Sequence, residues 1–138
     1  MNEELRRIFR QHSQSLLDEL TAHLADGSSY RYGKTDPRVL SERCRLLAEA
    51  LIRSTHQGTD QLGEFVATVA NIRFAEGFEL EDLQRALRIL EVAAWQIVVR
   101  QSSPESLVAN LAALNTAMGH ARDELARACQ KHAYTTAS

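Results

Sequence analysis

Apolar side chains recur every three or four residues along almost the whole chain, which is the period of an amphipathic α-helix. The first segment, for example, places Leu5, Ile8, Phe9, Leu16 and Leu20 on one helical face. No stretch of the sequence alternates apolar and polar residues in the way that a half-buried β-strand does. The periodicity therefore predicts an all-α fold.

Prolines and glycines divide this periodic pattern into segments. Asp36 and Ser103 each precede a proline, as an N-cap precedes the first residue of a helix. Gly58 and Gly77 each follow a periodic stretch, where a C-terminal cap belongs. We expect about five helices in a single compact bundle, over residues 3–25, 37–57, 60–76, 80–101 and 104–132.

The length and charge of the chain narrow its class. The 138 residues are enough for one domain, residues 1–138, and 44% of them are hydrophobic. Sixteen Lys and Arg against eighteen Asp and Glu give a net charge of −2, without the basic surplus that duplex DNA or an anionic membrane attracts. The N-terminus carries no stretch of signal-peptide type, and the most apolar segment, 89–99, is too short to span a bilayer. We expect a cytoplasmic protein that binds neither nucleic acid nor membrane.

Four polar residues fall inside or beside the apolar arcs: Arg43, Arg73, His12 and Glu91. A buried guanidinium needs a carboxylate or carbonyl partner, because leaving it unpaired would cost several kcal/mol. We expect structural pairing at these positions, with Glu91 ahead of Glu76 as the partner of Arg73. The alternative is an internal site for an anionic ligand.

The segment 80–101 has a second apolar face besides its main one. Val92, Trp95 and Val99 lie opposite the face that carries its leucines. A helix that is apolar on both sides is either central to a bundle or shared with a partner. We expect these three residues to form a homodimer interface.

The joint at Gly77 and Phe78 has the pattern of a helix end followed by a helix start. We expect Gly77 to adopt a left-handed conformation, which glycine does without steric cost. Phe78 and Leu83 are spaced for a hydrophobic staple at the start of the next helix. The one sizeable loop, 26–36, is either a flexible connector or a loop that contacts a ligand.

The sequence contains no nucleotide-binding loop, nucleophile elbow or HExxH motif, and its five histidines lack metal-ligand spacing. We expect no catalytic, cofactor or metal site, and interpret Cys44 and Cys129 as two reduced core cysteines.

Two alternative functions stay open. His23 begins a segment similar to a histidine phosphotransfer motif, although Asp26 replaces its lysine. A globin-like bundle that binds haem or another small ligand is the other alternative.

One stretch resembles a known family. Arg73 near the end of one helix, then Gly77 and Phe78, then a leucine-rich helix that reaches Trp95, resembles the N-terminal domain of RsbT co-antagonist proteins of the RsbRD type. The resemblance is sharpest over residues 62–99. Glu79 departs from the family's pattern, because a serine or threonine cap is expected there.

This resemblance implies a non-enzymatic, all-α regulatory domain that senses a signal or binds proteins in bacterial signal transduction. Such domains begin stressosome proteins, some sensor kinases and some helix-turn-helix regulators, and a related co-antagonist domain is globin-like without haem. In these relatives an output domain follows. The 138 residues leave no room for it, so we expect either an excised input domain or a stand-alone version.

Overall fold

The computed structural model describes residues 3–26, 30–55 and 60–137, and all regular structure within them is helical. This confirms the all-α prediction, although the described residues form seven helices instead of about five. The helices are α1 (Glu3–Gln11), α2 (Ser13–Ala25), α3 (Tyr30–Gly33), α4 (Pro37–Arg53), α5 (Gln61–Ala75), α6 (Leu80–Gln101) and α7 (Leu107–Ala137).

A break at His12 divides the first predicted helix into α1 and α2. The backbone of His12 leaves the helical region, with φ −112° and ψ 19°. The Ser13 hydroxyl donates a hydrogen bond to the carbonyl oxygen of Arg10 at 3.2 Å, a local bond that competes with helical pairing. The apolar spacing keeps its register across the break, from Phe9 to Leu16. The sequence pattern alone therefore indicated one continuous helix.

The other additional helix, α3, lies in the segment that we expected to be a loop. Tyr32 is only 7% exposed, and its ring packs edge-on against Phe78, with 5.0 Å between the ring centroids. This contact anchors α3 beside the start of α6. The interpretation of this part as a flexible connector is therefore wrong, because an aromatic side chain holds it to the core.

The predicted helix starts are confirmed to different degrees. Asp36 caps α4, since its carboxylate accepts a hydrogen bond from the backbone N–H of Arg38 at 2.8 Å. The last helix begins at Leu107, three residues later than predicted, because residues 104–106 form a turn. The predicted cap at Gly58 lies outside the described residues.

Glu4 explains why the chain turns before α7 begins. Its carboxylate accepts hydrogen bonds from the backbone N–H of Ser103 at 2.9 Å and from the Ser103 hydroxyl at 3.2 Å. The hydroxyl of Ser106 and, after it, these bonds from Ser103 hold the pKa of Glu4 below its usual value. Glu4 thus ties α1 to the connection between α6 and α7.

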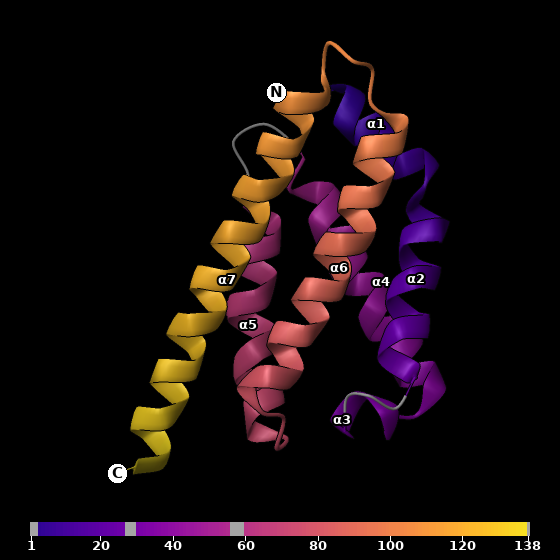
Figure 1. The fold of residues 1–138 in the computed structure, drawn as a ribbon. Coiled ribbons are helices and arrows are strands. Elements are labelled where there is room, and N and C mark those ends of the chain that lie inside the picture. The colour runs from indigo at the N-terminus through magenta and orange to yellow at the C-terminus, as the bar shows by residue number, and fades with distance from the viewer. Residues whose placement is uncertain (1–2, 27–29, 56–59, 138) are drawn as a thin grey trace.

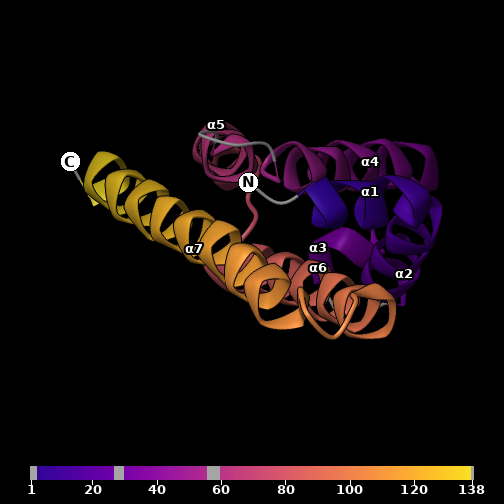
Figure 2. The same ribbon diagram turned by 90° about the horizontal axis from the view of Figure 1, so that it is seen from above.

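The five long helices form a closed ring of neighbours. In order, α2 packs against α4, α4 against α5, α5 against α7, α7 against α6, and α6 against α2. Seen from above, α4 and α5 lie in one layer and α6 and α7 in the other, with α1 and α2 at one side (Figures 1 and 2). The ring encloses one cluster of buried apolar side chains. A globin-like arrangement of these helices remains a prediction.

The buried face of α5 differs from the predicted one. Its buried residues repeat every four positions, at Leu62, Val66, Ala70 and Phe74. The three- and four-residue spacing of apolar side chains in this segment also predicts Ile72 on the buried face, but Ile72 is 48% exposed. The reason is that α5 packs chiefly on α7, so the buried face is rotated away from Ile72.

The joint between α5 and α6 has the predicted geometry. Gly77 has a φ of +97°, and among the described residues it is the one with a left-handed backbone. The N–H of Gly77 donates to the carbonyl of Phe74 at 3.1 Å, and the N–H of Phe78 donates to that of Arg73 at 3.0 Å. This pair of bonds is the Schellman motif, which ends a helix and satisfies its last carbonyls. Phe78 and Leu83 are both buried, as a staple requires.

Two glycine substitutions should have opposite effects on stability. Gly77→Ala should lower the free energy of unfolding by about 1 kcal/mol, because alanine disfavours a positive φ. Gly119 lies inside α7, and a Cβ built there meets no atom within 4 Å. Gly119→Ala should therefore raise stability by up to about 1 kcal/mol through helix propensity. Urea unfolding measures both, and a neutral Gly77→Ala would contradict the proposed importance of the turn.

The bonds of Glu4 should make stability depend on pH. Because its folded pKa is lowered from 4.5, Glu4 should stabilise the fold above that pH and lose this effect as the pH falls through the folded value. The wild type should therefore be more stable than Glu4→Gln at pH 7, and the difference should shrink in acid. In a Ser103→Ala background the same substitution should cost less. A difference that stays constant from pH 7 to pH 3 would contradict this assignment.

Candidate functional site

Two arginines from neighbouring helices converge on one carboxylate. Arg43 of α4 and Arg73 of α5 both pair with Oε1 of Glu76, which caps the C-terminus of α5. The distance is 3.7 Å from Nη2 of Arg43 and 3.3 Å from Nη1 of Arg73. The side chains are 25% and 14% exposed, respectively. One exposed carboxylate thus faces two half-buried guanidinium groups.

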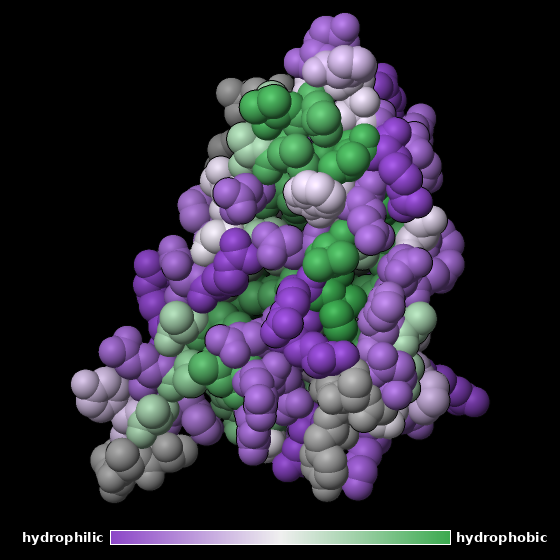
Figure 3. All heavy atoms as spheres, in the orientation of Figure 1, coloured by the Kyte–Doolittle hydropathy of each residue, from purple (hydrophilic) through white to green (hydrophobic). Residues whose placement is uncertain are grey.

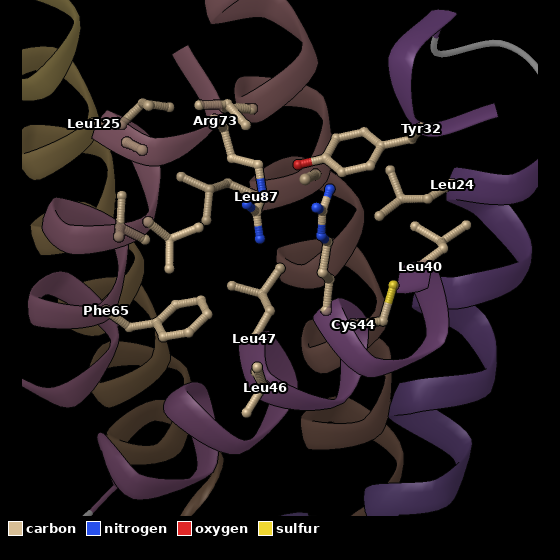
Figure 4. A pocket seen from close by; sticks show the side chains of 16 residues that line it. Leu24, Tyr32, Leu40, Cys44, Leu46, Leu47, Phe65, Arg73, Leu87 and Leu125 are labelled. Carbon is tan, nitrogen blue, oxygen red and sulfur yellow. The ribbon is translucent and has the colours of Figure 1, made fainter. Parts of the chain in front are cut away.

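These arginines lie at the edge of an apolar cavity of about 90 Å³ between the two layers of the ring. Figure 4 shows Arg73 and the hydroxyl of Tyr32 directed toward the same space. The other lining side chains come from α2, α4, α5, α6 and α7 and are almost all apolar: Leu24, Leu40, Cys44, Leu46, Leu47, Phe65, Val66, Val69, Ala70, Leu83, Ala86, Leu87 and Leu125. The cavity therefore has an apolar wall and a cationic edge.

Burial sets the protonation of two groups beside the cavity. It raises the pKa of Tyr32 far above its usual range, although the positive charge of Arg73 opposes this effect. Burial also raises the pKa of Cys44. At neutral pH the Tyr32 hydroxyl is therefore a hydrogen-bond donor, and Cys44 is a neutral thiol without the character of a nucleophile.

The predicted pairing of Arg73 with Glu91 is wrong. Glu91 accepts a hydrogen bond from Nη1 of Arg122, on α7, at 2.8 Å. Arg73 lies one turn before the joint, whereas Glu91 lies about 16 Å along α6 from its start. Because α6 packs on α7, Glu91 meets a side chain of α7 instead. The other predicted partner of Arg73, Glu76, is the one that the structure shows.

A second candidate site is an apolar face shared by α6 and α7. Val92, Trp95 and Val99 are exposed, Trp95 by 50%, and Val108 of α7 is 79% exposed. Figure 3 shows a hydrophobic area over the upper parts of these two helices in the orientation of Figure 1. Residues 92–99 and 106–119 contain no charged side chain. The face that we predicted on α6 is therefore uncovered by its own chain and extends onto α7.

Comparison with known proteins agrees with the pattern around the joint. Residues 3–137 match the family described as the RsbT co-antagonist protein rsbRD N-terminal domain. The chain belongs to this family. The match covers nearly the whole sequence, beyond the stretch 62–99 that carries the resemblance. No curated protein and no solved structure matches.

Membership in the RsbRD N-terminal family identifies the chain as a signalling input domain of the stressosome type. The joint that carries the family's pattern lies next to the cationic edge of the cavity. Arg73, which lines the cavity, is one helical turn before Gly77. Among the helices of the described residues, none is both long and apolar enough to cross a membrane.

Neither His12 nor His23 of this RsbRD N-terminal domain is among the residues that line the cavity. His23 is exposed near the end of α2, where it lies 3.2 Å from the carboxylate of Glu19. His12 is half-buried at the break before α2. Within the described residues, no three His, Cys, Asp or Glu side chains come together as a metal site would require.

Tyr32 is the cavity residue that sequence reasoning missed. The loop 26–36 contains two tyrosines and no aliphatic residue, and this was the available signal for an aromatic anchor. Periodicity could not place Tyr32, because its partner Phe78 is far away in the sequence and α3 is a single turn.

A double-mutant cycle should show which carboxylate is coupled to Arg73. Arg73→Met and Glu76→Gln should couple by about 0.5–1 kcal/mol in the free energy of unfolding, the range of a partly exposed ion pair. Arg73→Met and Glu91→Gln should be additive, because Glu91 pairs with Arg122. Chemical unfolding of the six proteins measures both cycles. Coupling to Glu91 and additivity with Glu76 would contradict the pairing that the structure shows.

Proposed function

We propose that this chain is a non-enzymatic regulatory domain, residues 1–138, which receives a signal and passes it on through protein contacts. The exposed apolar face on α6 and α7 is the single observation that carries this proposal, and membership in a family of signalling input domains supports it. In this proposal the protein acts in the bacterial cytoplasm and binds neither nucleic acid nor membrane. Its partners are other proteins of the same pathway.

We propose further that the face formed by Val92, Trp95 and Val99 joins two copies of this chain as a homodimer. Charged residues are depleted at the centre of protein interfaces, and aromatic residues are enriched there. The face has both features, because Trp95 is at its centre and the adjoining segments 92–99 and 106–119 carry no charge. A two-fold axis through Trp95 would bury the same patch of both copies.

Val108 extends the face in a way that favours a partner over simple exposure. Val108 has most of its surface in water, and a hydrophobic area covers the upper parts of both helices in Figure 3. Patches of this kind on soluble domains mark sites of association. Neither Val108 nor the three exposed residues of this face on α6 line the Arg43–Arg73 cavity, so association and ligand binding would use different side chains.

A small-ligand sensor is the second candidate function, and the cavity favours it. The cavity, about 90 Å³, is smaller than the roughly 150 Å³ that accommodates one benzene ring. It is therefore too small for haem. The alternative function is then the sensing of a ligand much smaller than haem. No comparable observation in the described residues favours phosphotransfer through His23, which lies 3.2 Å from the carboxylate of Glu19.

Light scattering coupled to size-exclusion chromatography tests the dimer. The wild type should elute with twice the monomer mass of 15.5 kDa, and Trp95→Glu should elute as a folded monomer because a buried carboxylate disfavours association. Ile72→Glu is the matched control, since Ile72 is similarly exposed on α5 but lies outside the face. It should remain a dimer.

A monomeric wild type at high micromolar concentration would contradict the dimer, and so would a Trp95→Glu variant that stays dimeric. Trp95 also provides a direct signal as the one tryptophan of the chain. Its fluorescence maximum should shift to shorter wavelength as concentration rises and the indole leaves water.

A further inference from the structure

We propose that the cavity between the two layers binds a short-chain aliphatic monocarboxylate, whose head group pairs with Arg43 and Arg73. This inference rests on the proposed input function and names the class of ligand that would act as its signal. Three features support it: the surplus of positive charge at the edge of the cavity, the size and lining of the cavity, and the position of Glu76.

The head group is indicated by the charges at the edge of the cavity. Arg43 and Arg73 carry two positive charges, and the pair shares a single carboxylate oxygen of Glu76, at 3.7 and 3.3 Å. A guanidinium has five N–H donors, so each retains the capacity to bind a second carboxylate. The protonated hydroxyl of Tyr32, directed toward the same space, adds a further donor (Figure 4). The site is therefore suited to an anion.

The tail is indicated by the cavity itself. Its wall is formed by aliphatic and aromatic side chains, among them Leu40, Leu47, Phe65 and Leu87. If about 150 Å³ holds the six carbons of benzene, the observed volume of about 90 Å³ holds three or four carbons. Phosphate and sulfate have no apolar part to fill it, and a long-chain fatty acid is too large. Butyrate has both the charge and the length that fit.

The position of Glu76 gives such a ligand a way to be sensed. Glu76 is the C-cap of α5 and directly precedes the left-handed Gly77. Since its carboxylate occupies the same two guanidinium groups, a bound monocarboxylate competes with it. Release of Glu76 acts on the turn that leads into α6, and the far half of α6 carries the face at Trp95. The ligand therefore acts on the helix that we propose to form the dimer.

Calorimetric titration and thermal unfolding of the full chain with simple sodium salts test this inference. Acetate, butyrate and octanoate are compared at equal ionic strength. Butylammonium chloride is the probe with a tail but no negative charge, and sodium phosphate is the probe with negative charge but no tail. Butyrate should bind most tightly and raise the melting temperature most, as a ligand selective for the folded state does. Octanoate should bind less tightly than butyrate because the cavity ends.

Three variants locate the site. Arg73→Met should weaken butyrate binding by about tenfold or more through loss of a charge-assisted bond. Arg43→Met, at a more exposed arginine, should also weaken it and keeps the test valid if Arg73→Met does not fold. Glu76→Gln should strengthen binding, since it removes the internal competitor. The matched controls are Arg122→Met and Glu91→Gln, which alter an ion pair whose members do not line the cavity, and they should bind butyrate as the wild type does.

A fourth variant tests the tail. Val69 lies one turn before Arg73 and lines the cavity, so Val69→Phe should fill it and abolish the preference for butyrate over acetate. The inference is overturned if the wild type does not bind butyrate, if all anions act alike, or if neither arginine variant weakens binding. The mass of the same samples is measured by light scattering. A dimer that does not bind butyrate refutes this inference alone, whereas a monomer that binds it refutes only the proposed dimer.

Discussion

The left-handed turn at Gly77 is the constraint on which the rest of the structure depends. By ending α5 after Ala75, it places Arg73 one turn before the joint and leaves Glu76 as the cap residue. It also directs the chain so that Phe78 meets Tyr32 and α6 starts beneath α3. One backbone conformation that glycine adopts without strain therefore sets the direction of α6, the anchoring of α3 and the cationic edge of the cavity.

The ring of helices explains why a cavity exists there at all. Although α5 and α6 follow one another in the chain, each packs chiefly on other helices, α5 on α7 and α6 on α7 and α2. Side chains from both layers meet in the space between them. Beside Arg43 and Arg73 they do not fill this space, and the cavity remains. A tightly packed pair of consecutive helices would have buried these arginines without a cavity.

The two candidate sites involve different halves of the same helix. The first half of α6 lines the cavity through Leu83 and Leu87, and the second half exposes Trp95. A ligand in the cavity and a partner at Trp95 would therefore contact the same helix through different residues. This arrangement suits an input domain, in which a ligand and a protein partner must influence one another without sharing a surface.

Four features could be derived from the sequence alone: the helical class, the cap at Asp36, the turn at Gly77 and the second apolar face at Val92, Trp95 and Val99. Each of these follows from local periodicity or from the backbone preference of one residue. The break at His12 is accompanied by a local bond from Ser13 to Arg10, and it leaves the apolar spacing unchanged, so periodicity does not reveal it. The burial of Tyr32 and the partner of Glu91 became visible only with the packing of the helices. These depend on which helices become neighbours, and here α6 packs on α7, so that Glu91 meets Arg122 instead of Arg73. Apolar periodicity predicts which face of a helix is buried. Which side chain contacts that face depends on how the helices pack against one another.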